Sequence, residues 1–117
     1  MDQEYLLSKI SEKSSLTQVQ DYVKAVMELH GFDTQPIQDT MLLLLEETGE
    51  LAKAIRKSAT NMSIDVDKLQ NYDTVESELA DVFFVLLAVC GQMNVNLFDA
   101  FKEKSKENCK RTWSFER

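Results

Sequence analysis

Apolar side chains return at helical spacing along most of this chain. From Leu16 to His30 they recur every three or four residues, which is the pattern of an amphipathic helix. Ser15 followed by Gln18 has the pattern of a capping box at the start of this helix, and Gly31 is suited to end it. The preceding segment, residues 1–15, is mostly polar, and we assign it to an N-terminal extension. Residues 16–117 are predicted to form one domain.

Three further helices are predicted downstream. The first begins at Pro36, a residue suited to a first turn, and continues to about Ser58. Residues 60–73 mix Asn, Ser and Asp with isolated apolar residues, so we expect a connection with room for a helical turn. A helix over residues 74–93 follows, with Asp73 or Thr74 as its cap. The last helix is predicted over residues 96 to about 111.

Two of these helices are apolar around nearly their whole circumference. In the helix that starts at Pro36, Leu42 and Leu45 lie on the opposite side from Leu43, and residues 82–90 of the next helix are almost uniformly apolar. A helix with two apolar faces needs two covering layers. In a chain of 117 residues the second layer is expected to be another subunit. We therefore predict an all-α bundle of four to five helices, completed by assembly into a homodimer or homotetramer.

Composition supports this interpretation and narrows the possible functions. One proline and three glycines disfavour a turn-rich β fold. The net charge of −7 argues against bulk binding to nucleic acid or to an anionic membrane. No run reaches the ~18 apolar residues of a membrane span, and we expect no signal peptide. Cys90 lies in an apolar run and Cys109 in a charged one, so we expect reduced thiols and a cytoplasmic protein.

Acidic residues follow the leucines of the helix that starts at Pro36. At about 100° per residue, Glu47 and Glu50 fall on the same stripe as Leu43, and Glu46 lies at its flank. Carboxylates that face a core must be ion-paired or must bind a cation, because an unpaired buried charge is costly. Lys53, one turn after Glu50, can pair only with that acid.

A second acidic pair, Glu78 and Asp81, has the same spacing and immediately precedes the other apolar run. Two antiparallel helices would place this pair opposite Glu47 and Glu50. Four carboxylates in one site repel one another and require cations, and an all-oxygen set favours Mg²⁺ or Mn²⁺ over zinc. A di-iron bundle is disfavoured, because its E-x-x-H motif is missing.

These residues also resemble a known family. The pattern E-E-x-x-E, then about 27 residues, then E-x-x-D is similar to the all-α nucleotide pyrophosphohydrolases of the MazG-like superfamily. The stretches EETGELAKAIRK and ESELADVFFVLLAVCGQMNVNLFDAFKEK, and the ending K-x-x-x-N-x-x-R-x-W, extend the resemblance over roughly Leu16 to Trp113. It implies Mg²⁺-dependent hydrolysis of a nucleoside triphosphate to the monophosphate and pyrophosphate. The family counterpart of Glu46 binds a further metal or assists the water, and Glu46 or Glu50 is the candidate for accepting a proton.

Cationic residues of the last helix are candidates for binding phosphate. Lys104, Asn108 and Arg111 recur at helical spacing on the stripe of Leu97 and Phe101, which we expect to face inward. Lys53 and Arg56 are further candidates. Four aromatic residues are available to stack on a base, although each is more often a packing residue: Phe32, Tyr72, Trp113 and Phe115.

Substrate identity stays open at this level. Pyrimidine-specific members of the family carry an aromatic residue one turn after the E-x-x-D aspartate, and this chain has Val85 there. That difference argues against pyrimidine specificity. Two alternatives remain beside the triphosphate pyrophosphohydrolase: a non-catalytic helical interaction module on the same scaffold, and an enzyme similar to phosphoribosyl-ATP pyrophosphohydrolases.

Overall fold

The computed structural model describes residues 1–114, apart from the side chain of Gln70. Within that range it contains five α-helices, two short 3-10 helices and no strand, so the predicted all-α class is confirmed. In chain order the elements are α1 (Gln3–Ser8), α2 (Leu16–Leu29), η1 (Phe32–Thr34), α3 (Ile37–Ala59), η2 (Val66–Asn71), α4 (Val75–Gln92) and α5 (Leu97–Asn108).

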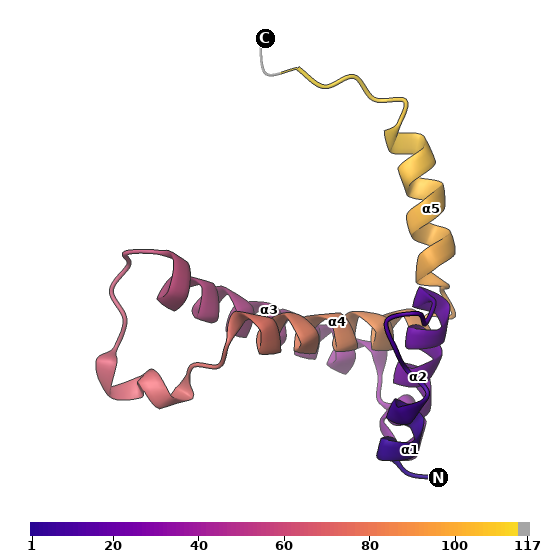
Figure 1. Cartoon of the computed structure of the whole chain (residues 1–117), viewed down its shortest axis with the longest axis horizontal. Helices are drawn as coiled ribbons and strands as arrows, with labels where there is room; N and C mark the ends of the chain where they lie inside the picture. Colours follow the sequence, from indigo (N-terminus) through magenta and orange to yellow (C-terminus); the bar gives the residue numbers. More distant parts are fainter. Residues whose placement is uncertain (115–117) are drawn as a thin grey trace.

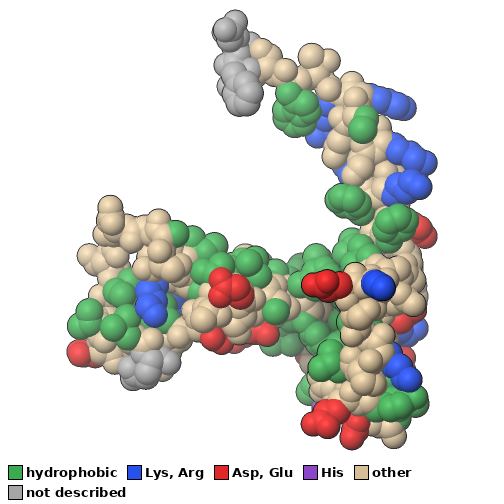
Figure 2. All heavy atoms as spheres, viewed as in Figure 1, with side chains coloured by type: hydrophobic (Ala, Val, Ile, Leu, Met, Phe, Trp, Pro, Cys, Tyr) green, Lys and Arg blue, Asp and Glu red, His purple; other side chains and the backbone are tan. Residues whose placement is uncertain are grey.

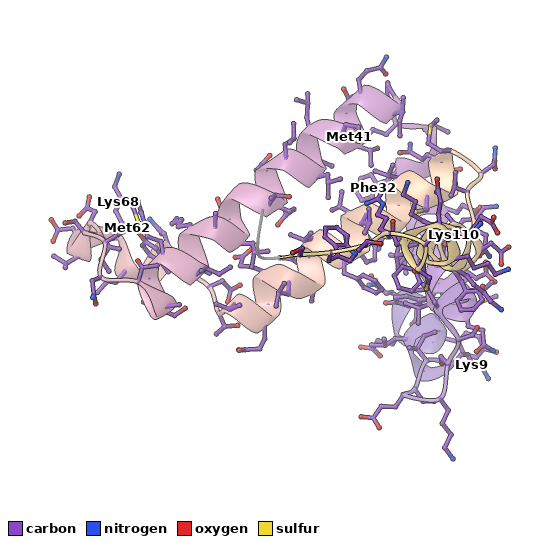
Figure 3. The ribbon with its side chains drawn as sticks, turned by 90° about the horizontal axis from the view of Figure 1, so that it is seen from above. Lys9, Phe32, Met41, Met62, Lys68 and Lys110 are labelled. Atoms are coloured by element: carbon purple, nitrogen blue, oxygen red, sulfur yellow. The ribbon has the colours of Figure 1, made fainter. Side chains whose placement is uncertain are left out.

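The molecule is built around a hairpin of α3 and α4 (Figure 1). These two helices run antiparallel and pack along one another, and α2 packs against α4 at one end of the hairpin. The view from above shows the same pairing, with Met62 and Lys68 in the connection at the far end (Figure 3). The short α1 contacts α2, and α5 also packs on α2 before it projects away from the hairpin.

Side-chain caps set the helix starts where the sequence predicts them. Ser15 and Gln18 form the expected capping box on α2. The Thr74 hydroxyl accepts from the backbone N–H of Ser77 at 3.1 Å and begins α4. Asn96 caps α5. Such caps satisfy N–H groups that have no partner within the helix.

The ends of α2, α3 and α4 also lie within one residue of the expected positions. The helix α2 ends at Leu29 with His30 as its cap, and Gly31 follows with a φ of 74°. Glycine adopts this left-handed conformation without strain, which explains the stop. The helix α5 ends at Asn108, so the expected end near Arg111 is wrong.

The buried core lies where α2 crosses α4. Val23 and Met27 of α2 pack there against Leu87 and Ala88 of α4. Figure 2 shows hydrophobic side chains gathered where the hairpin meets α2. This packing fixes one end of the hairpin. Partly buried residues around the cluster are Leu16, Val19, Tyr22, Phe84 and Leu97.

Away from this core, large apolar side chains are uncovered. Leu42 and Leu45 of α3 are each 64% exposed, and Phe101 of α5 is 65% exposed. In the single chain, the α5 stripe that we expected to face the core does so only near Leu97. The rest of α5 projects away from α2 (Figure 1). The uncovered α3 face is where we predicted a second layer, and the assembly remains a prediction.

No helix in the described range is, by itself, long and apolar enough to cross a membrane. The helices α4 and α5 pass that test together by length and composition only, and they are bent by 97° at the break between them.

We expect sedimentation to report at least a dimer at micromolar concentration. Covering a leucine side chain is worth about 1.5–3 kcal/mol, and α3 exposes several. The double variant Leu42→Lys, Leu45→Lys should shift the protein toward monomer, whereas Lys13→Glu on the exposed segment before α2 should not. A wild-type monomer, or equal assembly of the double variant, would remove α3 from the interface.

Candidate functional site

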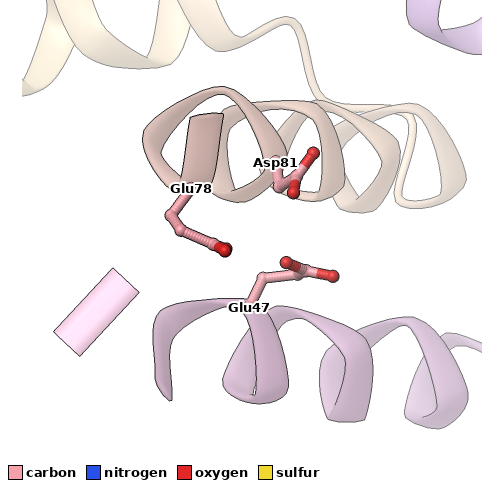
Figure 4. A group of neighbouring side chains, drawn as sticks. All are labelled: Glu47, Glu78 and Asp81. Atoms are coloured by element: carbon pink, nitrogen blue, oxygen red, sulfur yellow. The ribbon is translucent and has the colours of Figure 1, made fainter. Parts of the chain in front are cut away.

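Three of the predicted acids converge between the two helices of the hairpin. Glu47 comes from α3, while Glu78 and Asp81 come from successive turns of α4. One carboxylate oxygen of each lies within 4.8 Å of one oxygen of each of the others, and the three side chains point toward one another in Figure 4. This carboxylate group is thus positioned by the pairing of α3 with α4.

Glu78 is the most buried member, at 6% exposure. Its Oε2 atom is buried and has no hydrogen-bond partner among the described residues. Burial raises the pKa of Glu78 most strongly, and the negative charges of Asp81, Asp73 and Glu50 raise it further, against an opposing effect of Lys53. A buried carboxylate oxygen without a donor is costly, and a cation bound there would satisfy it.

Glu47, on the other helix, is affected by burial and by neighbouring negative charges. Partial burial raises its pKa first, followed by the charges of Asp81 and Glu78, with smaller effects of Glu46 and Glu50. Like charges at this distance disfavour joint ionisation. The group is therefore electrostatically unfavourable unless positive charge is added.

The donor set fits a hard divalent cation. All three groups offer carboxylate oxygen, the ligand type that Mg²⁺ and Mn²⁺ accept. The chain's one histidine, His30, lies at the end of α2, where its ring nitrogen is 3.1 Å from Oε1 of Gln3. Burial raises the pKa of the Cys90 thiol, which disfavours the thiolate that a soft metal needs. The group could hold Mg²⁺ or Mn²⁺ rather than zinc.

The other two acids of α3 border this group. Glu50 is half-buried, and its Oε2 lies 3.9 Å from Nζ of Lys53, which is the ion pair expected from the sequence. Glu46 is exposed at the flank of the stripe, as predicted. The structure thus brings Glu47, Glu78 and Asp81 together and leaves Glu50 beside them. The ligand role of Glu50 and the proton-accepting roles of Glu46 and Glu50 remain predictions.

Lys53 and Arg56 lie on α3 just after the acids. Their common partner is Tyr72, the residue that follows η2, and no pattern in the sequence indicates this contact. Asp73, which the sequence suggests only as a helix cap, also affects the site: it is a source of negative charge at Glu78, and its carboxylate accepts from the Ser77 hydroxyl at 3.0 Å. Neither contact follows from helical periodicity, because both residues precede α4.

The candidates on the last helix lie elsewhere. Lys104, Asn108 and Arg111 are all exposed, and α5 with the segment that follows it leads away from the α3–α4 hairpin of the same chain (Figure 1). Nζ of Lys104 pairs with Oε2 of Glu107 at 3.3 Å. Trp113 is 77% exposed, and Phe115 lies outside the described residues. In the single chain these residues therefore do not face inward, and their phosphate-binding role remains a prediction.

An apolar cavity of about 190 Å³ lies one helical turn from the carboxylate group. Leu43 lines it four residues before Glu47, and Val85 lines it four residues after Asp81. Phe32 reaches the cavity from η1, and the buried Thr40 supplies a hydroxyl. The site therefore combines an acidic end and an apolar end. The remaining lining residues are Met27, Gln35, Phe84 and Ala88.

The helical hairpin and its three carboxylates define an all-α domain with a site that could hold a divalent cation. The family model of the MazG nucleotide pyrophosphohydrolase domain matches residues 35–113, which is more than half of the chain. The chain therefore belongs to this family, and the resemblance seen in the sequence is confirmed. Membership indicates nucleotide pyrophosphohydrolase activity in general, in a family that is typically metal-dependent. No curated protein and no solved structure gives a significant match.

The matched range includes α3, α4 and α5 and begins after α2. It contains every residue of the carboxylate group as well as the candidates on the last helix. The domain boundary between residues 15 and 16 is not tested by this match and stays a prediction.

We expect Glu78→Gln to stabilise the metal-free protein at neutral pH. The folded state holds protons on Glu78 and Glu47 at higher pH than the unfolded chain does, because both pKa values are raised. Between the ordinary and the raised pKa the folded state binds more protons, so stability falls as pH rises through that window. In the variant, the free energy of unfolding should decrease less steeply as the pH rises.

Thermal melts in chelator from about pH 4 to about pH 8 measure the effect. Mg²⁺ at a hundred times its Kd should add about 2.7 kcal/mol to the wild type and less to the variant. Glu103→Gln, an exposed acid on α5, is the control and should behave as wild type. Identical pH profiles for Glu78→Gln and the wild type would contradict the repulsion argument.

Proposed function

We propose that this protein is a Mg²⁺-dependent nucleoside triphosphate pyrophosphohydrolase that releases the monophosphate and pyrophosphate. The proposed substrates are deoxynucleoside or damaged triphosphates, in a cytoplasmic role of clearing the nucleotide pool. The observation that supports it most is the convergence of Glu47, Glu78 and Asp81, where Glu78 has a buried carboxylate oxygen with no hydrogen-bond partner in the described part of the chain. A polyphosphate substrate needs positive charge at such a site, and a cation bound to these residues would provide it.

The acids have separate roles in this proposal. Glu47, Glu78 and Asp81 hold the metal, and Glu50 joins them when its pairing with Lys53 is exchanged for the metal or substrate. These residues would hold Mg²⁺, or Mn²⁺ as a substitute, which when bound would supply positive charge for the phosphates and make the attacking water more acidic. Glu46 or Glu50 accepts the proton of the attacking water.

The nucleoside is proposed to occupy the apolar cavity beside the acids. The cavity starts one turn from Glu47 and from Asp81, so phosphates at the metal would direct the base toward it. Phe32 supplies an aromatic face there. Val85 is aliphatic and cannot stack on a base as an aromatic residue would. This supports a substrate preference that is not restricted to pyrimidine nucleotides.

The last helix is proposed to act on a neighbouring subunit. In the single chain, α5 and the segment after it lead away from the α3–α4 hairpin, and a homodimer or homotetramer would allow Lys104, Asn108 and Arg111 to bind phosphate on another subunit. Trp113 would contact the same substrate. Lys53 and Arg56 bind the phosphates from the same chain as the acids.

Asp81→Asn should abolish Mg²⁺-dependent pyrophosphate release, because it removes a charge from the metal site while nearly preserving its shape. The matched control is Glu76→Gln, an exposed acid in the first turn of the same helix. A release assay across canonical and modified triphosphates, with and without Mg²⁺, measures both variants. Turnover by Asp81→Asn equal to that of the control would remove Asp81 from the site.

Lys104→Ala should lower kcat/KM about ten- to a hundredfold, since a charge-assisted contact is worth roughly 1.5–3 kcal/mol. Mg²⁺ affinity should not change. Lys106→Ala removes a charge from the last turn of the same helix and serves as the control for the helix dipole. Full activity of Lys104→Ala with a slightly lower melting temperature would show that Lys104 only stabilises the helix end.

A further inference from the structure

Tyr72 gathers three cations from the last turns of α3. Its hydroxyl accepts a hydrogen bond from Nη2 of Arg56 at 3.0 Å. Its ring faces Nζ of Lys53 at 4.7 Å and Nζ of Lys57 at 5.7 Å from the ring centroid. Lys53 also donates to the backbone oxygen of Asn71 at 3.3 Å, next to Tyr72 in the chain. The connection between α3 and α4 is thereby held against the basic end of α3.

Lys53, Arg56 and Lys57 form a cationic group whose positive charge is only partly balanced by neighbouring acids. In the described part of the chain its one ion pair joins Lys53 to Glu50, at 3.9 Å. The Nε atom of Arg56 is buried and has no hydrogen-bond partner among the described residues. A buried guanidinium donor without an acceptor is unfavourable, and three cations around one ring repel one another. An anion would relieve both conditions.

The chain leaves space for that anion. A cleft of about 310 Å³ is lined by Lys53 and Arg56 together with Gly49 and Ala52. The two small residues keep the cleft open, and a Cβ added to Gly49 would meet no atom within 4 Å. Oxygen atoms with negative charge would find two cationic side chains there.

Lys53 connects this cleft with the carboxylate group. It pairs with Glu50 on one side and faces Tyr72 on the other. A chain of phosphates lying on a metal at Glu47, Glu78 and Asp81 would meet these cations next. Guanidinium and ammonium groups are the usual partners of phosphate oxygens.

We propose that Tyr72 is a positioning residue that holds Lys53 and Arg56 in place to bind the terminal phosphates, which leave as pyrophosphate. This inference rests on the proposed triphosphate pyrophosphohydrolase function. The ring orients Lys53, and the hydroxyl orients the guanidinium of Arg56. Tyr72 itself does not touch the substrate, and its ring is engaged by lysines rather than free to stack on a base.

The two contacts of Tyr72 can be removed separately. Tyr72→Phe keeps the ring and its lysines but removes the acceptor for Arg56, and Tyr72→Leu removes both. The matched control is Tyr5→Leu, which breaks a similar contact, with Nζ of Lys9 4.9 Å from the Tyr5 ring centroid, on the distant α1. Calorimetric titration with inorganic pyrophosphate in Mg²⁺ measures the terminal-phosphate site directly. Titration with a nucleoside monophosphate measures the rest of the site.

Tyr72→Phe should weaken pyrophosphate binding about three- to tenfold, less than the loss of a direct charge-assisted contact, because it removes only the hydrogen bond that orients Arg56. Tyr72→Leu should weaken it about threefold more, because cation–π contacts are lost as well. Binding of the monophosphate should stay at the wild-type value in both variants. Tyr5→Leu should change neither.

Three results would overturn this role: no binding of pyrophosphate by the wild type, unchanged pyrophosphate binding in both Tyr72 variants, or an equal loss of pyrophosphate and monophosphate binding with a lower melting temperature. The last result would mean that Tyr72 only anchors the connection. Failure of the proposed function looks different, because pyrophosphate binding would still depend on Tyr72 while the wild type hydrolysed no triphosphate.

Discussion

Repulsion among the carboxylates between α3 and α4 is the constraint on which this structure depends. Pairing the two helices buries Glu78 and places Glu47 and Asp81 against it, so the same contact that builds the hairpin also concentrates negative charge. The buried oxygen of Glu78 lacks a donor, and no protein cation occupies that position among the described residues. A divalent cation bound there would stabilise this helical pair, because it would remove both the repulsion and the unsatisfied oxygen.

The rest of the chain supports the hairpin at its two ends. At one end α2 packs on α4 through Val23 and Leu87, which fixes the apolar cavity beside the acids. At the other end the connection folds back, and Tyr72 holds it against the cations of α3. The site thus changes along the hairpin from apolar to acidic to basic. That order matches a nucleoside, a metal-bound phosphate and further phosphates.

Much of this could be predicted from the sequence, because helical periodicity and capping are local. Ser15, Thr74 and Asn96 mark helix starts correctly, and the E-x-x-E and E-x-x-D spacing places acids on facing stripes. Periodicity does not determine side-chain rotamers. The sequence therefore could not decide whether Glu50 turns toward Lys53, as it does, or toward the other acids. The direction of α5 depends on the turn after α4 and on α2, which no local pattern encodes. Contacts of Tyr72 arise from a loop and were missed for the same reason.

The central claim is that Glu47, Glu78 and Asp81 together hold a divalent cation. Anomalous diffraction from crystals grown with Mn²⁺ tests it most directly, because the peak locates the ion independently of activity. The account predicts a peak between α3 and α4, within bonding distance of one oxygen from each of the three residues. A peak only at other residues, in crystals that contain bound Mn²⁺, would contradict the account.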